Sequence, residues 1–270
     1  MIDFKNKKYV MGIINITPDS FFDGGKYNSL ILALNRVESI ISEGADIIDI
    51  GAESSRPGSK RIDAKEELKR LIPVLKEIRK NYSNIIISID TYKPEVARIA
   101  LEEGADIIND IYGLRKEGMI DIIAKYNSYC IIMHMKGDPE NMQINPYYDN
   151  VVEEIASFFE ERIREAEEKG IKRDKIIIDP GIGFGKRLED NINILKNIKY
   201  FKDRFKLPVL IGLSRKSMIG QILNNSVEER KNGSIILNTI SFMNGADIIR
   251  VHDVKESVEI KKIISFLNYN

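Results

Sequence analysis

Polar side chains recur along this sequence, each directly after a short run of apolar residues. Most are carboxylates, carboxamides or cations, which bind the charged or hydrogen-bonding groups of a ligand. A single Asp or Asn at such a point is ordinarily a helix cap or a turn residue. Repetition after eight successive apolar runs favours one shared site instead. The residues are Asn15, Glu53, Arg56, Asp90, Asn109, Asp110, His134, Asp179, Ser214, Arg215, Lys216, Arg250 and His252.

These residues fall into two chemical groups. Asp90, Asn109 and Asp179 offer donors and acceptors that suit the edge of one flat heterocycle. The cationic group suits a phosphate, and its members are Arg56, Arg215, Lys216, Arg250 and His252. A solvated loop or a structural ion pair also explains Arg56 or Arg215, and for Arg215 both interpretations stay open. We expect the ring-binding groups to lie deep and the cations to lie nearer the opening.

The sequence favours Mg²⁺ over a structural zinc ion. His134 and His252 are the two histidines and Cys130 is the single cysteine, so no zinc-ligand spacing occurs. A phosphorylated substrate brings Mg²⁺, which needs few protein oxygens, and Asn15 could supply one of them. The run DPGIGFGK at Asp179–Lys186 is rich in glycine but matches no phosphate-loop pattern, so alone it indicates little.

The apolar runs that precede these residues predict eight strands, which alternate with amphipathic helical segments. The strands are expected at Tyr9–Asn15, Ala45–Ile50, Ile85–Asp90, Ala105–Asn109, Tyr129–His134, Lys175–Asp179, Pro208–Gly212 and Ala246–His252. The helices are expected at Ser29–Glu43, Asp63–Lys80, Pro94–Glu103, Lys116–Lys125, Asp149–Lys169, Asn191–Phe205, Val227–Asn244 and Glu256–Leu267.

This alternation predicts an α/β fold of the (β/α)8 TIM-barrel type, with residues 1–270 in a single domain. The pentapeptide GADII recurs at Gly44–Ile48, Gly104–Ile108 and Gly245–Ile249, each time between a helix and a strand. An open, doubly wound sheet remains an alternative, because periodicity does not reveal closure. In a barrel, residues that follow the strands meet at one rim, where active sites lie. Two loops rich in turn formers, Thr17–Gly25 and Ser54–Ser59, are suited to close over that rim.

Composition excludes several classes of partner. The chain has 270 residues, with 41 Lys and Arg against 41 Asp and Glu, so no net charge attracts nucleic acid or an anionic membrane. We find no apolar run of about 20 residues that could cross a bilayer and no signal-like segment in Met1–Val10. The lone Cys130 fits a buried strand in a reducing compartment. We therefore expect a cytoplasmic protein that acts on small molecules.

Seven segments together resemble the dihydropteroate synthase family, in the order in which that family has them. The resemblance extends from end to end and is specific for the set, although each piece alone is only moderately specific. The segments are Met11–Gly25, Gly51–Ser59, Ser88–Ala97, Ile107–Gly113, Ile178–Lys186, Gly212–Gly220 and Arg250–Val254.

The resemblance implies a Mg²⁺-dependent TIM-barrel enzyme, usually a homodimer, in folate biosynthesis. Such an enzyme condenses 6-hydroxymethyl-7,8-dihydropterin pyrophosphate with p-aminobenzoate by dissociative cleavage of a C–O bond, and sulfonamides mimic the aminobenzoate. The matching residues for the pterin are Asp90, Asn109, Met133, Asp179 and Lys216. Those for the pyrophosphate are Ser55, Arg56, Arg250 and His252, with Asn15 for the metal. Those for p-aminobenzoate are Pro57, Phe184, Lys216 and Ser217.

By the same resemblance, Asp23 supports the cationic intermediate, and catalysis falls to it together with Lys216, Arg250 and His252. Three residues, Phe22, Ala52 and Ser55, differ from the residues that the family commonly has at these positions. The property that these differences could alter is the affinity for p-aminobenzoate and for sulfonamides. The chief rivals are a methyltetrahydrofolate-binding methyltransferase, which needs no pyrophosphate site, and a catalytically silent pterin-binding homologue.

Overall fold

The chain forms the predicted barrel of parallel strands. The computed structural model describes residues 2–4, 7–17, 25–54, 59 and 61–267, with side chains from residue 30 onward in the first helix. Its strands are β1 (Tyr9–Asn15), β2 (Ile47–Gly51), β3 (Ile86–Asp90), β4 (Ile107–Asp110), β5 (Tyr129–Met133), β6 (Ile176–Asp179), β7 (Leu210–Ile211) and β8 (Ile248–Val251). Each lies within about two residues of its predicted position.

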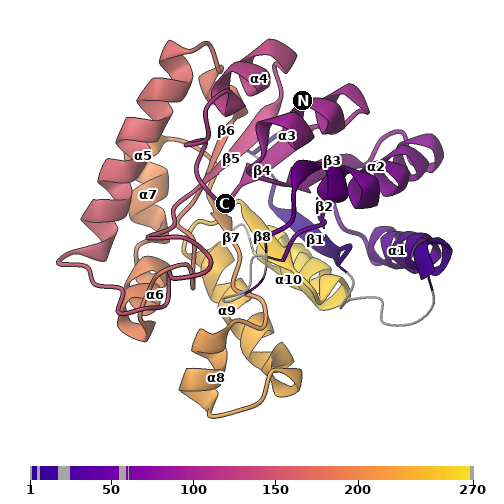
Figure 1. The fold of residues 1–270 in the computed structure, drawn as a ribbon. Coiled ribbons are helices and arrows are strands. Elements are labelled where there is room, and N and C mark those ends of the chain that lie inside the picture. Colours follow the sequence, from indigo (N-terminus) through magenta and orange to yellow (C-terminus); the bar gives the residue numbers. More distant parts are fainter. Residues whose placement is uncertain (1, 5–6, 18–24, 55–58, 60, 268–270) are drawn as a thin grey trace.

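The strands close into a ring. Hydrogen-bonded neighbours follow the order β6-β5-β4-β3-β2-β1-β8-β7. A parallel bridge between Ile178 and Val209 then joins the two ends of this order, β6 and β7. Figure 1 shows the strands at the centre and the helices around them. The open, doubly wound sheet is thereby excluded.

The helices of the described residues surround the ring. They are α1 (Gly25–Ser42), α2 (Ala64–Asn81), α3 (Pro94–Glu102), α4 (Met119–Tyr126), α5 (Val151–Glu168), α6 (Leu188–Lys196), α7 (Ile198–Phe205), α8 (Ser217–Leu223), α9 (Lys231–Met243) and α10 (Val254–Phe266). The single helix predicted at Asn191–Phe205 was wrong, because the chain breaks at Asn197 into α6 and α7. The helix α8 was not predicted.

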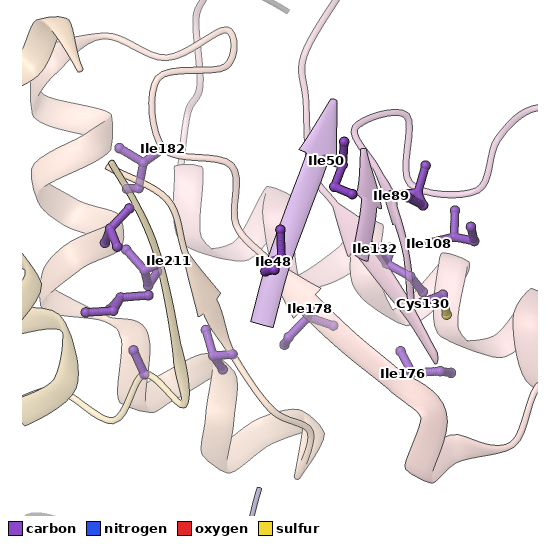
Figure 2. Packing of buried hydrophobic residues seen from close by; sticks show 14 of the residues in the cluster. Ile48, Ile50, Ile89, Ile108, Cys130, Ile132, Ile176, Ile178, Ile182 and Ile211 are labelled. Carbon is purple, nitrogen blue, oxygen red and sulfur yellow. The ribbon is translucent and has the colours of Figure 1, made fainter. Parts of the chain in front are cut away.

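Alternate residues of each strand face outward and pack under the helices. Figure 2 shows this layer, in which Ile48 and Ile50 of β2, Ile132 of β5 and Ile178 of β6 belong to one cluster. Each of these side chains is at most 1% exposed. Burial on both faces explains why the strands read as continuous apolar runs. Cys130 lies in the same cluster, as the sequence predicted.

The repeated GAD sequence has a structural cause. Gly44, Gly104 and Gly245 have φ of 96°, 96° and 104°, the left-handed conformation that ends a helix and favours glycine. The Asp two residues later accepts a hydrogen bond from the N–H of a residue in or next to a neighbouring strand. These bonds run from Val10 to Asp46, from Ile87 to Asp106 and from Val209 to Asp247. The repeat therefore fixes strand register at the amino-terminal rim.

The remaining alternate residues point into the barrel. Near the amino-terminal ends of the strands, the interior of the barrel is filled by a second apolar cluster that includes Tyr9, Ile47, Tyr129 and Ile248. Towards the carboxyl ends of the strands this filling becomes polar. No helix within the described ranges is long and apolar enough to span a membrane.

Candidate active site

Arg250 lies between two carboxylates inside the carboxyl-terminal end of the barrel. Its Nε donates to Asp49 Oδ2 at 2.6 Å, and its Nη2 donates to Asp90 Oδ2 at 2.8 Å. Asp49 also accepts from Ser88 Oγ at 2.6 Å and from Asn109 Nδ2 at 3.3 Å. Four strands thus contribute to one network of hydrogen bonds around a single guanidinium.

Arg250 supplies the countercharge that the fully buried Asp49 requires. Its Cα lies in register with Met11 of β1, whereas Asp49 pairs with Ile13, two residues further along the same strand. Because the strands of a closed barrel are tilted, this offset on alternate strands places the two residues in the same layer of inward-facing side chains. That the cations lie nearer the opening than the ring-binding groups stays a prediction.

Burial changes the protonation of the acids at this rim. Burial raises the pKa of Asp90 to about 7, although the charge of Arg250 opposes the shift. It also raises the pKa of Asp110 to about 7, despite hydrogen bonds from the N–H groups of Tyr112 and Leu114. For Arg250, burial lowers the pKa, but the charges of Asp49 and Asp90 outweigh it and raise the pKa overall. Arg250 is thus a permanent cation beside Asp90, a carboxyl whose pKa lies near neutrality.

A second group of residues forms around Asp179 and Lys216. Lys216 immediately precedes α8, and its Nζ donates to the carbonyl of Ile182 at 2.5 Å and lies 4.5 Å from the centre of the Phe184 ring. Burial lowers the pKa of Lys216 to about 8, partly offset by the charge of Asp179. Burial raises the pKa of Asp179, which is opposed first by Lys216 and then by a hydrogen bond from the Gly181 N–H.

Apolar side chains line the same rim. Met133 is 4% exposed and packs in a small cluster with Tyr92, Ile111 and Met142, against which Phe184 is partly buried. Such a surface suits the faces of a flat ring whose edges meet polar groups. The predicted pterin residues Asp90, Asn109, Met133, Asp179 and Lys216 are thus all placed at one end of the barrel.

The remaining predicted residues lie around this rim. Asn15 ends β1, and its Oδ1 faces Gly51 from the side opposite Asp90 Oδ2. His252 follows β8, with its Nδ1 3.1 Å from Ser214 Oγ, and Ser217 is exposed at the start of α8.

Arg215 forms a structural ion pair, one of the two interpretations that the sequence left open. It donates from Nη2 to Asp253 Oδ1 at 2.6 Å and from Nε to Asp253 Oδ2 at 3.1 Å. This bidentate pair ties the start of α8 to the start of α10 through two nitrogens of the guanidinium. The choice that the sequence left open for Arg215 therefore falls on the ion pair.

Some predicted residues lie outside the described residues. These are Asp23 of the first loop and Ser55, Arg56 and Pro57 of the second, together with two of the three departures from the family pattern, Phe22 and Ser55. The second loop is anchored where it leaves β2. Glu53 accepts from Lys93 Nζ at 2.5 Å, from the Tyr92 hydroxyl at 2.9 Å and from the N–H of Ile62 at 3.1 Å. One carboxylate thus ties both ends of the loop.

Sequence reasoning missed Asp49. It lies inside β2, two residues before the strand ends, whereas the search concentrated on residues at strand ends. The available signal was a carboxylate in a strand of otherwise apolar residues, with the same parity as the inward-facing Ile47. A charge in that position requires a buried partner, and Arg250 is that partner.

One cavity of the described structure lies away from this rim. It has about 480 Å³ and is lined by residues at the amino-terminal end of the strands, including Ile86, Asp106 and Tyr129. The polar residues described above are absent from its lining. We place the site at the carboxyl-terminal rim, because active sites of TIM barrels lie there and because the buried charges gather there.

Comparison with known proteins decides the family. Residues 11–252 match the family described as pterin binding enzyme. The dihydropteroate synthase of Escherichia coli K12 is 47% identical over 256 residues, which cover 95% of this chain and 90% of that protein. The chain belongs to the dihydropteroate synthase family.

Solved structures of dihydropteroate synthases agree closely with this one. The Yersinia pestis enzyme in complex with a sulfonamide drug has a TM-score of 0.93 and 42% identity, and the match covers 100% of this chain and 97% of that one. The Clostridium difficile enzyme in the presence of pteroic acid has a TM-score of 0.93 and 41% identity over 100% of both chains. The predicted TIM barrel is confirmed, and the chain is a transferase of folate biosynthesis.

Proposed function

We propose that this chain condenses 6-hydroxymethyl-7,8-dihydropterin pyrophosphate with p-aminobenzoate, giving 7,8-dihydropteroate and pyrophosphate. The observation that carries the proposal is the convergence of Asp49, Asp90 and Arg250 with Asp179 and Lys216 at one rim. It provides hydrogen-bonding groups for a ring and cations for a leaving pyrophosphate at one end of the barrel. Pteroic acid, which joins a pterin to aminobenzoate, accompanies the related C. difficile structure.

In this proposal the pterin lies edge-on to Asp90, Asn109 and Asp179 and flat against Met133. Carboxylates accept hydrogen bonds from the ring N–H and amino groups, and Lys216 donates to a ring acceptor. The bond from Arg250 uses only part of the accepting capacity of Asp90, so ring donors can bind to the same carboxylate. The apolar wall around Met133 removes water from the face of the ring.

The pyrophosphate is assigned to Arg250 and His252, together with Ser55 and Arg56 of the second loop. Arg250 stabilises the negative charge that develops as the C–O bond breaks. The residues also fit Mg²⁺. Asn15 Oδ1 and Asp90 Oδ2 both lie near the backbone of Gly51 and are oxygen ligands of the kind that Mg²⁺ prefers. Mg²⁺ needs only a few such protein oxygens, because phosphates and waters supply the rest. When bound, Mg²⁺ would supply positive charge against the departing pyrophosphate.

p-Aminobenzoate is assigned to Pro57, Phe184, Lys216 and Ser217. Lys216 lies over the Phe184 ring, so its ammonium can meet a carboxylate while the ring packs on the aminobenzoate. In the dissociative route, the dihydropterin holds the methylene cation, Asp23 supports that charge, and the neutral arylamine attacks it. The protein contributes position and exclusion of water rather than a covalent intermediate.

The test is release of pyrophosphate from both substrates in the presence of Mg²⁺. We expect turnover by the wild type and a loss of about 10²- to 10³-fold in Arg250→Ala, the usual effect of one lost transition-state donor. Asp90→Asn should mainly weaken binding of the pterin. Unchanged activity in both variants would contradict the site assignment.

The same assay separates the rival functions. A methyltetrahydrofolate-binding methyltransferase has no use for cations against a pyrophosphate, whereas Arg250 lies in the centre of this rim. A silent homologue would bind the pterin without turnover. Pterin binding without pyrophosphate release would favour one of these rivals.

We also propose that the chain is a homodimer that pairs through α9 and α10. These helices pack side by side, as Figure 1 shows, and expose apolar side chains in a stripe along α9 at Ile236, Ile240 and Met243. Phe266 at the end of α10 is 87% exposed. An apolar stripe of this kind suits a self-complementary interface.

Sedimentation of Ile240→Glu tests the dimer. We expect a monomer, because the new carboxylate would be buried against its own copy across a twofold axis. Ile144→Glu is the control, since Ile144 is 74% exposed on the β5–α5 connection, away from this stripe, and should leave the dimer intact. Residence in the cytoplasm stays a prediction, which the single buried thiol of Cys130 fits.

A further inference from the structure

The loop from Pro180 to Lys186, which joins β6 to α6, is held largely by side chains. Four consecutive carbonyl oxygens each accept a hydrogen bond from a different side chain. The pairs are Lys216 Nζ to Ile182 O (2.5 Å), Gln143 Nε2 to Gly183 O (2.6 Å), Lys186 Nζ to Phe184 O (3.0 Å) and the Tyr148 hydroxyl to Gly185 O (2.8 Å). The shape of the loop therefore depends on groups from three separate segments.

The same loop lies directly on the backbone that follows β5. Gly181 and Gly185 have φ of 69° and 64°, which favour glycine. A Cβ at Gly181 would overlap the carbonyl oxygen of His134, and one at Gly185 would overlap that of Lys136. Because backbone touches backbone here, a shift of the β5 end moves the loop with it.

Lys186 joins these two segments from within. It is 4% exposed, and besides Phe184 O its Nζ lies 3.0 Å from His134 Nδ1 and 3.3 Å from His134 O. His134 is itself buried, with its ring edge-on to Phe158 at 5.0 Å between centroids. Burial lowers the pKa of Lys186 and of His134 well below their ordinary values. An almost fully buried amine with three partners fits a structural role rather than a ligand contact.

We propose that Lys186, with His134 and Tyr148, is a positioning residue that sets the Phe184 ring against the Lys216 ammonium for p-aminobenzoate. The inference rests on the proposed assignment of Phe184 and Lys216 to that substrate. Lys216 donates to Ile182 O and lies over Phe184, so displacement of the loop moves both of its partners at once. Of the pterin groups, Asp90 and Asn109 lie on β3 and β4, away from this loop, whereas Asp179 and Lys216 contact it. Displacement of the loop should therefore affect the aminobenzoate site more than the pterin site.

The primary test is Lys186→Met, which keeps the length of the side chain and removes the donor. We expect the KM for p-aminobenzoate to rise about tenfold, as for one lost buried hydrogen bond. The KM for the dihydropterin pyrophosphate should rise less, because Asp90 and Asn109 still hold the ring. A matched control is Lys8→Met, because Lys8 is 8% exposed and its Nζ donates to Ala246 O at 2.9 Å near the opposite rim. That variant should lose stability and keep both KM values.

A milder variant keeps the test decisive if Lys186→Met fails to fold. Tyr148→Phe retains the ring and removes the donor to Gly185 O. We expect a smaller rise in the KM for p-aminobenzoate than in Lys186→Met, and a still smaller change in the KM for the pterin substrate. If neither folded variant changes the KM for p-aminobenzoate, or if both KM values change equally, the positioning role is wrong.

A double-mutant cycle with Phe184→Leu separates this inference from the proposed function. If Lys186 acts through Phe184, Lys186→Met should add nothing to the KM for p-aminobenzoate in the Phe184→Leu background. Fully additive effects would overturn the inference. If Phe184→Leu alone leaves that KM unchanged, the assignment of Phe184 in the proposed function fails. If it raises the KM and Lys186→Met does not, the positioning role alone fails.

Discussion

The Arg250 guanidinium donates a 2.8 Å hydrogen bond to Asp90, and so joins a residue assigned to the pyrophosphate with one assigned to the pterin. The two functions are therefore not served by separate parts of the barrel. A change in the charge of Asp90 is felt by Arg250, because the pair is enclosed and poorly screened. Recognition of the ring and stabilisation of the leaving group are coupled through this contact.

Asp49 is expected to matter for activity although it lies below the rim. In Asp49→Asn the partner of Arg250 Nε loses its negative charge, so the guanidinium is held less firmly. We expect kcat/KM for the pterin substrate to fall about 10- to 100-fold, the effect of losing about 1.5–3 kcal/mol in a charged hydrogen bond. Steady-state kinetics measure this.

Asp247→Asn is the matched control for that variant. Like Asp49, Asp247 is buried and pairs with a cation, in this case Lys202 at 2.7 Å. Unlike Asp49, it lies at the amino-terminal rim, away from the site. It should lower the free energy of unfolding and keep kcat/KM. Equal losses of activity in the two variants would mean that Asp49 acts through stability alone.

The pH profile should be narrow. Asp90, with a pKa raised to about 7 by burial, loses its negative charge below that pH, and Lys216, with a pKa lowered to about 8, loses its positive charge above it. We expect kcat/KM for the pterin substrate to be greatest between these values. In Lys216→Arg the side chain stays charged, so the alkaline fall should disappear at reduced activity. A flat profile for the wild type from pH 6 to pH 9 would contradict both roles.

Asp110 should make the protein less stable as the pH rises. Its pKa is raised to about 7 in the folded protein, against about 3.9 in an unfolded chain. The folded state therefore binds the proton more tightly, and this favourable contribution is complete below the unfolded pKa and is lost as the pH rises through about 7. Urea unfolding at pH 5.5 and pH 8 should show a smaller change for Asp110→Asn than for the wild type. An equal change would assign the pH dependence to other groups.

Two glycines allow the cost of left-handed backbone strain to be compared with the cost of steric overlap of an added Cβ. Gly118 has φ of 83° and nothing within 4 Å of a Cβ, whereas Gly181 has φ of 69° and would meet the His134 carbonyl. We expect Gly118→Ala to lower the free energy of unfolding by about 1–2 kcal/mol, from left-handed strain alone. Gly181→Ala should cost about 1–3 kcal/mol more, because of the overlap. Urea unfolding of both variants checks this, and equal losses would show that the loop yields easily.

The strands were predicted well from the sequence. A strand that is buried on both faces appears in the sequence as a short, mainly apolar run, such as Ile47–Ile50. Short helices were harder. The helix α8 has seven residues, with Gly220 in its interior, and gives too few turns for a periodic signal. At Asn197 the apolar spacing continues through a break in the backbone, so α6 and α7 appeared as one helix.

The site was predictable in residue type but not in pairing. Polar groups after the strands indicated the rim correctly, since parallel strands carry their carboxyl ends to one side. The partners of Arg250 were not predictable, because Asp49 is 201 residues away and meets it only when the ring closes. Likewise, the bidentate pair of Arg215 with Asp253 depends on how α8 and α10 lie together.

The bridge between Ile178 and Val209 is a seam in the barrel. The other strand pairs share at least two registered residue pairs, whereas β6 and β7 share this one, supported by a hydrogen bond from Ile178 N to Pro208 O. Asp179 follows on one side of the seam, and Lys216 follows on the other. A ligand that binds both Asp179 and Lys216 would hold β6 and β7 together. Amide hydrogen exchange at Ile178 should therefore slow when a pterin binds.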